Sequence, residues 1–213
     1  MQPQSSARPS PTSARPTRAQ GALLFVQQYL RAPGQIGAVA PSSDGLCERM
    51  LETIDFAAAR TLVEFGPGPG NVTRVIASRL QPTTRFFAIE ANPAMAAVFH
   101  GRFPGLRLHE GSAANVCEFC VKEGLPPSNS VDAIISGLPW AAFADELQNS
   151  ILEAAVRVLR PGGQMVTFAY HTGLLMPAGK RFARTLPRHF SKVEKSRPVW
   201  FNLPPAFVYR CTK

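Results

Sequence analysis

The chain has 213 residues, of which 45% are apolar and 17% are charged, and it contains 20 prolines. This length fits one domain with a full hydrophobic core and a loop-rich segment, and it leaves too little chain for two independent domains. No apolar run approaches the ~18 residues that a membrane span requires, and the run from Ala22 to Val26 is too short for a signal-peptide core. These features disfavour integral membrane and secreted proteins, so we expect a cytoplasmic location.

The net charge of +9 is unevenly distributed along the chain. Residues 1–20 carry three arginines and no acid, residues 21–159 carry 10 bases and 13 acids, and residues 160–213 carry 10 bases against Glu194 alone. The C-terminal cations, among them Lys180, Arg181 and Arg184, predict an anionic partner such as a phosphate backbone or an acidic membrane surface. A solvated face that only keeps the protein soluble is the alternative.

The four cysteines include one Cys117-x-x-Cys120 pair. A structural zinc site needs a second pair at similar spacing, which Cys47 and Cys211 do not supply. We therefore predict reduced cysteines and no metal site.

The N-terminal part of the chain divides into a tail and a short helix. Residues 1–20 are rich in Pro, Ser and Arg and lack large apolar side chains, which predicts a disordered tail. Apolar residues at positions 23, 26 and 30 and at 25 and 29 predict an amphipathic helix that ends at Ala32-Pro33-Gly34. We assign residues 21–45 to this helix and a lid segment, and residues 46–213 to the main domain.

Strand-like runs alternate with helical patterns in the main domain. The expected strands are Thr61–Phe65, Arg85–Ile89, Leu106–His109, Val131–Ile135 and Gln164–Tyr170, and the expected helices are Asn71–Leu80, Pro93–His100 and Asp145–Leu159. The last helix is expected to stop at Pro161-Gly162-Gly163. Two further strand-like runs, around Phe190–Glu194 and Ala206–Arg210, follow. This alternation predicts an α/β fold, with a parallel sheet covered by helices on both faces.

A glycine loop stands where the first strand passes into the first helix. The segment reads Glu64-Phe65-Gly66-Pro67-Gly68-Pro69-Gly70, and a second acid, Glu90, ends the next strand. Glycines at this place let a ligand approach the backbone, and an acid about 20 residues further on is placed to bind a ribose hydroxyl pair. The acid Glu64 would repel a pyrophosphate but suits a cationic ligand. A plain glycine turn is the structural alternative.

These residues resemble the class I S-adenosylmethionine-dependent methyltransferases. The resemblance implies a Rossmann-like fold with a seven-stranded, mostly parallel sheet, a C-terminal antiparallel hairpin and an N-terminal helical extension. It implies S-adenosyl-L-methionine as cofactor and S-adenosyl-L-homocysteine as product. The cofactor residues that it implies are Gln35, Ser42, Glu64, Gly66, Gly68, Gly70, Glu90, Ala91, Ser112, Ala113 and Ser136. Ser112 stands where an aspartate is common in the family, and a hydroxyl is a weaker acceptor for adenine than a carboxylate.

The fourth strand ends in Ser136-Gly137-Leu138-Pro139-Trp140. This stretch is similar to the acceptor motif of amino-group methyltransferases such as the ribosomal RNA adenine dimethyltransferases, in which Asn stands at the position of Gly137. The Gly removes the side-chain acceptor, so recognition of a base is weakened while a plain amine beside Trp140 remains compatible. A β-turn with a tryptophan in the core is the structural alternative.

Together with Gly137-Leu138-Pro139, two more stretches of the chain, residues 31–43 and 200–210, resemble the bacterial phospholipid N-methyltransferase family. The resemblance covers Leu23 to Arg210. It implies methylation of the phosphatidylethanolamine head group and its mono- and dimethyl forms, by an enzyme whose N-terminal helix binds the membrane. The expected membrane-binding residues are Leu24, Phe25, Arg31, Lys180, Arg181 and Arg184. Packing of the helix on the core is the alternative.

The expected catalytic residues are Gly137, Leu138, Pro139, Trp140, Tyr29 and His171, the last because an imidazole titrates near neutrality. His171 is equally well explained as an ordinary loop histidine. We expect a monomer that associates peripherally with an anionic membrane and binds no DNA, and RNA is disfavoured. A methyltransferase of a soluble small-molecule amine, an RNA adenine N6-methyltransferase and a cofactor-binding protein without turnover are the alternatives.

Overall fold

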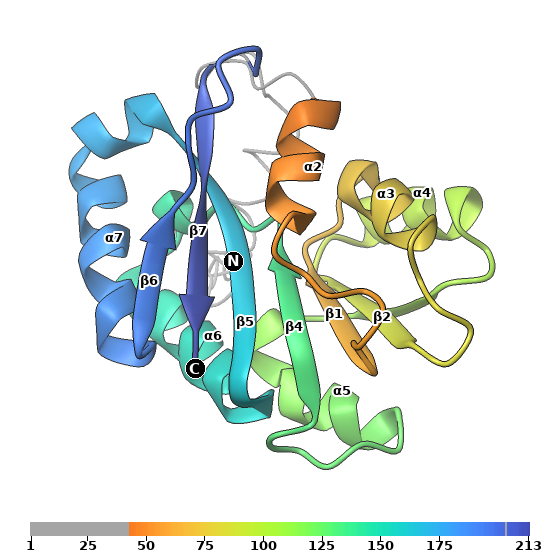
Figure 1. Cartoon of the computed structure of the whole chain (residues 1–213). Helices are drawn as coiled ribbons and strands as arrows, with labels where there is room; N and C mark the ends of the chain where they lie inside the picture. Colours follow the sequence, from red (N-terminus) through yellow and green to blue (C-terminus); the bar gives the residue numbers. More distant parts are fainter. Residues whose placement is uncertain (1–42, 203) are drawn as a thin grey trace, which may run out of the picture.

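The computed structural model describes residues 43–202 and 204–213, so the expected tail, N-terminal helix and most of the lid segment lie outside the described residues. Seven strands form one sheet in the order β3-β2-β1-β4-β5-β7-β6 (Figure 1). Their bounds are β1 Thr61–Phe65, β2 Arg85–Glu90, β3 Arg107–Glu110, β4 Val131–Ser136, β5 Leu159–Tyr170, β6 Lys192–Lys195 and β7 Ala206–Thr212. Strands β1 to β5 pair in parallel, and β7 runs antiparallel to both neighbours. The predicted mixed sheet with a C-terminal hairpin is confirmed.

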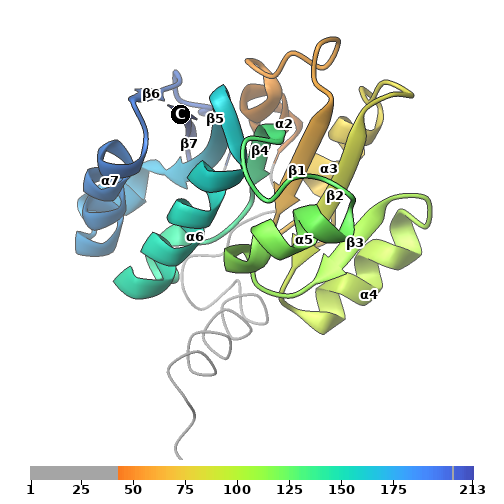
Figure 2. The ribbon, with the colours of Figure 1, turned by 90° about the horizontal axis from the view of Figure 1, so that it is seen from below.

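Helices cover both faces of this sheet. One face carries α2 (Asp44–Leu51), α3 (Asn71–Ala77) and α4 (Pro93–Arg102), and the other carries α5 (Val116–Lys122), α6 (Asp145–Val158) and α7 (Pro177–His189). Figure 2 shows α5, α6 and α7 on one side of the strands and α2 on the other. Three short 3-10 turns follow strands: η1 (Ala113–Asn115), η2 (Trp140–Ala142) and η3 (His171–Leu175).

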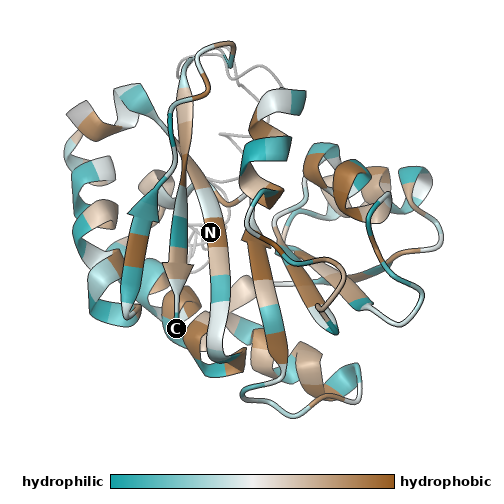
Figure 3. Cartoon of the chain, viewed as in Figure 1, coloured by the Kyte–Doolittle hydropathy of each residue, from teal (hydrophilic) through white to brown (hydrophobic). Residues whose placement is uncertain are grey.

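The sequence of the central strands explains why the sheet is covered twice. All five residues of β1 are buried, which is typical of a parallel strand with helices on both faces. Val63 and Phe65 join the hydrophobic cluster under α5, α6 and α7, whereas Leu62 joins the cluster under α2, α3 and α4. Apolar residues accordingly dominate the middle of the sheet (Figure 3).

The start of β5 differs from the expectation. The segment Pro161-Gly162-Gly163 was expected to lie outside any strand, but β5 begins at Leu159 and includes it. The pairing with β4 shifts there, from Val131 opposite Leu159 to Ala133 opposite Gln164. Pro161, Gly162 and Gly163, which are typical turn residues, therefore form an irregularity in the pairing of β5 with β4, as glycines in strands often do.

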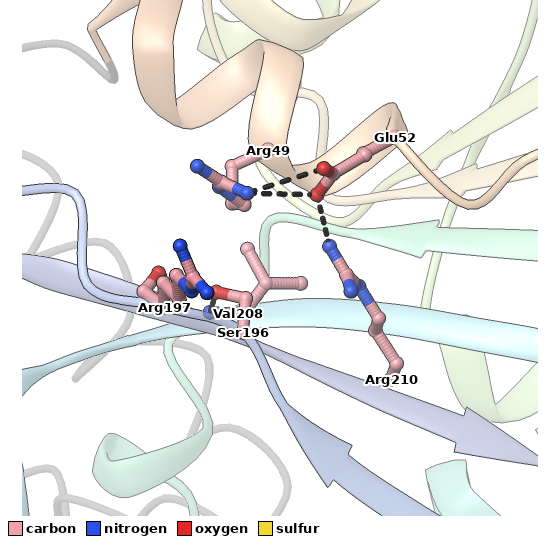
Figure 4. Close-up of polar contacts among 6 residues, drawn as sticks. All are labelled: Arg49, Glu52, Ser196, Arg197, Val208 and Arg210. Atoms are coloured by element: carbon pink, nitrogen blue, oxygen red, sulfur yellow. Dashed lines mark hydrogen bonds and ion pairs between the residues drawn. The ribbon is translucent and has the colours of Figure 1, made fainter.

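Helix α2 is fixed to the sheet by its cap and by an ion-pair cluster. The Ser43 hydroxyl accepts from Leu46 N at 3.3 Å and caps the helix. Just past its end, the Glu52 carboxylate accepts from Arg49 at 3.0 Å and from Arg210 of β7 (Figure 4). Burial acts to raise the pKa of Glu52, but the hydrogen bonds from Arg210 and Arg49 hold that pKa below its usual value.

None of the helices in the described part of the chain has the length and apolar content to cross a bilayer.

Candidate functional site

The order of the strands places two loops side by side at the carboxyl edge of the sheet. Strands β1 and β4 are neighbours, but the chain continues from β1 toward β2 and from β4 toward β5. Ligands of open α/β sheets bind at such a switch point, outside the carboxyl ends of the strands. Gly66 follows β1 and Gly137 follows β4, so the glycine loop and the acceptor motif expected from the sequence meet at this point.

The glycine loop needs its glycines for backbone reasons. Gly66, Gly68 and Gly70 have φ angles of 63°, 54° and 82°, in the left-handed region that side chains disfavour. A Cβ on Gly70 would also overlap the ring of Phe103. Gly70 is the N-terminal cap of α3. The sequence therefore forms a tight turn whose backbone a ligand is able to approach closely.

Glu90 connects the end of β2 to the glycine loop. Its carboxylate accepts from Gly68 N at 3.1 Å and from Asn92 N at 2.9 Å, and the residue is 5% exposed. Burial raises the pKa of Glu90, and the hydrogen bonds from Asn92 and Gly68 oppose that rise. The backbone N–H of Ala91 also lowers this pKa as a donor, and a carboxylate has about four acceptor positions, so at least one remains for a hydroxyl of a ligand. The position and remaining capacity fit the predicted ribose contact.

Glu64 is buried within β1, below the glycine loop. The hydroxyl of Thr73 in α3 donates to its carboxylate at 2.7 Å. Burial raises the pKa of Glu64 to about 8, and the nearby charge of Glu90 adds to that rise. A buried carboxyl of this kind is stabilised as the anion by a cationic ligand. Thr73 was not among the residues expected at the site, because a threonine inside a helix pattern gives no signal by itself.

The two loops at the switch point are in direct contact. A Cβ built on Gly137 would lie 2.6 Å from the carbonyl oxygen of Gly66, and one built on Gly66 would lie 2.7 Å from Leu138 Cδ2. Gly137 N donates to Phe65 O at 2.8 Å and closes this contact. The glycine at position 137 is therefore required by the packing of the turn against the glycine loop.

Ser136 and Trp140 are bonded to each other beneath the turn. The indole Nε1 donates to Ser136 Oγ at 3.1 Å and to Thr167 Oγ1 at 3.0 Å. The ring stacks on Phe182 of α7 with centroids 5.0 Å apart, and Trp140 is only 3% exposed. In the described structure Trp140 is a core residue that fixes the turn. Contact of its ring with an amine, and contact of Ser136 with the cofactor, remain predictions.

The loops after β2 and β3 complete the carboxyl edge. Ala91 follows Glu90 directly. After β3, Ser112 caps η1 by accepting from Ala114 N at 3.2 Å, and Ala113 is 5% exposed. The Ser112 hydroxyl therefore has a local partner, and it keeps its own O–H to donate. Contacts of these three residues with an adenine or ribose remain predictions.

His171 lies at the same edge, immediately after β5. Its ring stacks on Trp200 with centroids 5.8 Å apart and meets Phe207 edge-on at 5.4 Å. His171 Nε2 is buried and has no hydrogen-bond partner among the described residues. This nitrogen is a candidate proton acceptor, so the catalytic role of His171 remains a prediction. Trp200 belongs to the stretch 200–210 that resembles the lipid N-methyltransferases, and its contact with His171 was not expected from the sequence.

Other expected site residues lie on α7 or outside the described part of the chain. Lys180, Arg181 and Arg184 are exposed on α7, and Arg181 Nε lies 3.5 Å from Asp145 Oδ1. Leu138 and Pro139 are half-buried in the turn after Gly137. The expected residues at positions 24, 25, 29, 31, 35 and 42 lie outside the described residues. No cluster of potential metal ligands occurs in the described ranges.

Comparisons with known proteins agree with this geometry. Residues 62–163 match a family profile described as a methyltransferase domain. The chain is 32% identical over 192 residues to the ornithine lipid N-methyltransferase of Singulisphaera acidiphila, with 88% of this chain and 94% of that protein covered. The O-methyltransferase of Bacillus cereus, solved with SAH, is similar at a TM-score of 0.63, 16% identity and 91% coverage of both chains. The O-methyltransferase TomG of Streptomyces achromogenes, solved with SAM, is similar at a TM-score of 0.59 and 16% identity, with 94% of this chain and 92% of that chain covered.

Proposed function

The chain belongs to the class I S-adenosylmethionine-dependent methyltransferases, and on that premise we propose that it methylates an amine on the head group of a membrane lipid. The observation that carries the proposal is the 32% identity to an ornithine lipid N-methyltransferase along 88% of this chain. Phosphatidylethanolamine and its mono- and dimethyl forms are the acceptors that we propose first. Ornithine lipid, the acceptor named for the relative, is the second.

Different residues at the switch point would bind different parts of the methyl donor, S-adenosylmethionine. S-adenosylmethionine supplies a methyl group on a sulfonium, which a neutral amine attacks in line. Glu90, which keeps acceptor capacity beside its backbone donors, would bind the ribose hydroxyls. The buried Glu64 carboxylate favours the cationic amino-acid end of the cofactor through its charge. The glycine loop lets the backbone approach the ligand.

The acceptor motif supports an amine over a nucleic acid base. Because a Cβ at position 137 would meet Gly66 O at 2.6 Å, the turn has no space for the Asn side chain that holds a base N–H in the adenine methyltransferases. The backbone carbonyl of Gly137, and His171 Nε2, which has no hydrogen-bond partner among the described residues, are the acceptors that remain for an ammonium proton. The enzyme contributes orientation and exclusion of water more than acid–base chemistry.

Access to a lipid acceptor implies association with the membrane surface. Exposed cations on α7, among them Lys180, Arg181 and Arg184, are suited to an anionic leaflet. We propose a peripheral protein on the cytoplasmic side, with residues Leu24, Phe25 and Arg31 contributing as the family resemblance implies. We propose that it acts as a monomer.

The test is methyl transfer from labelled S-adenosylmethionine to four acceptors in parallel. These are vesicles with phosphatidylethanolamine, vesicles with ornithine lipid, a panel of soluble amines, and RNA. We expect label in one of the two lipids, more with anionic lipid present and less at high salt. Label only in soluble amines or RNA contradicts the lipid proposal and leaves the family assignment intact.

A further inference from the structure

Large apolar side chains are exposed on the loop between β6 and β7. Phe201 is 97% exposed and Trp200 is 66% exposed. Met176, at the start of α7, is 59% exposed. These are the three most exposed of the five large hydrophobic side chains that are exposed in the described ranges. Trp200 and Phe201 are adjacent in the chain, and exposed apolar groups gathered in one place mark an interaction surface more often than single ones do.

This loop stands at the same edge of the sheet as the donor site. Val199 N donates to Ala206 O at 2.7 Å, and Ala206 pairs with Tyr170 at the carboxyl end of β5. The Trp200 ring stacks on His171, the first residue after β5. In Figure 1 the loop from β6 to β7 projects beyond the upper end of the sheet, near the start of α2 and of α7.

The base of the loop is held by hydrogen bonds, and the side chains at its tip are exposed. Asn202 is 2% exposed, and its side-chain oxygen accepts from Ser43 N at 3.2 Å. Its amide nitrogen donates to Pro204 O at 2.9 Å, and its backbone N donates to Val199 O at 3.3 Å. A tip whose base is fixed in this way loses little conformational entropy when it inserts into a partner.

The charges around the tip are mostly positive. Lys180, Arg181 and Arg184 on α7, and Lys195 and Arg197 before the loop, are exposed. The acids on the flanking elements are paired: Asp145 lies 3.5 Å from Arg181, Glu194 lies 2.9 Å from Lys192, and Asp44, next to Ser43, pairs with Arg74. Aromatic residues favour the head-group level of a bilayer, and basic residues beside them favour anionic lipid.

We propose that Trp200 and Phe201 insert into the interface of an anionic lipid bilayer and turn the carboxyl edge of the sheet toward the head groups. This inference rests on the proposed lipid acceptor and names the element that contacts the membrane. Insertion next to His171 brings the head groups to the edge where the glycine loop and the Gly137 turn lie.

Intrinsic fluorescence tests the proposal directly, because the chain contains only two tryptophans and the other, Trp140, is 3% exposed. The probe is vesicles of phosphatidylglycerol and phosphatidylcholine, which contain no primary, secondary or tertiary amine and therefore no acceptor. With the full chain we expect a blue shift of emission and quenching by brominated acyl chains. Trp200→Phe should lose both signals and still co-sediment with vesicles.

Affinity is then compared between variants. Phe201→Ser should bind vesicles at least about tenfold more weakly, because burial of one Phe side chain is worth about that factor or more. Val121→Ser is the matched control, because Val121 is 57% exposed on α5, and its vesicle affinity should not change. Unchanged affinity of Phe201→Ser overturns the proposal. So does a contribution of Trp200, taken as the difference between the spectra of the full chain and Trp200→Phe, that is already blue-shifted before vesicles are added, because residues 1–42 or a second copy would then cover the tip.

The same experiment separates this inference from the proposed function. Methyl transfer is measured on a short-chain amine lipid dispersed as monomers, which needs no bilayer. Transfer to it without tryptophan insertion into vesicles overturns the inference and keeps the function. Insertion without transfer to any amine lipid overturns the proposed function and keeps the membrane contact.

Discussion

Substitution of Gly137 by Ala tests whether the two loops at the switch point are packed as described. The added Cβ would lie 2.6 Å from Gly66 O, where real Cβ atoms come no closer than 3.0 Å, so the glycine loop must retreat by at least about 0.4 Å. Overpacking of this kind costs about 1–3 kcal/mol, or a fall in Tm of about 2–10 °C for a chain of this size. The same movement displaces Gly68 N from Glu90, so the Kd for S-adenosylmethionine should rise about tenfold.

The assay is thermal unfolding and calorimetric titration of the cofactor, with Gly101→Ala as the control. Gly101 lies in α4, has nothing within 4 Å of its added Cβ, and should keep or gain stability, since Ala favours a helix by about 0.5–1 kcal/mol over Gly. If Gly137→Ala matched this control in both Tm and Kd, the argument that position 137 must be glycine would be refuted.

Three further substitutions address the buried polar groups. Because the pKa of Glu64 is raised from 4.5 to about 8, the folded state keeps a proton on Glu64 in this pH range that the unfolded state has lost, so the free energy of unfolding falls as pH rises through the range. Glu64→Gln should flatten this part of the plot of Tm against pH. It should also weaken cofactor binding. Glu90→Ala should weaken cofactor binding tenfold or more, which titration calorimetry measures against Glu110→Ala, the exposed acid opposite it on β3. Trp140→Phe keeps the stacking but loses the N–H bonds beneath the turn, and chemical unfolding should detect a loss of about 1–3 kcal/mol; an unchanged unfolding midpoint would contradict that role.

The strand, glycine loop and helix at the proposed donor site could be predicted because they are encoded locally. Strand β1, the glycine loop, α3 and Glu90 follow one another within 30 residues, from Thr61 to Glu90, and each has its own signal in residue type and spacing. The acceptor half could not be predicted in the same way. The use of Trp140 in the core depends on Phe182, which lies 42 positions later on α7.

Helix α7 itself was missed for a physical reason. It buries only Phe182 and Leu186, carries Pro177 at its start and Pro187 inside, and is otherwise strongly basic. A pattern with so few apolar positions suggests a solvated loop, and only packing against α6 and the η2 turn makes it a helix. Helices α2 and α5, of eight and seven residues, are too short to give a clear periodic signal.

The contact between the two loops constrains how acceptor specificity arises in this protein. Since position 137 is closed by Gly66 O, a polar side chain cannot be placed there by a single substitution without disturbing the donor site. Selection of the acceptor must then depend on groups further out along the carboxyl edge. The elements there are η3 with His171, the start of α7 and the loop with Trp200, which come from the C-terminal quarter of the chain. The cations also gather in that quarter, so under the proposed function the same segment would both recognise the acceptor amine and face the anionic surface that presents it.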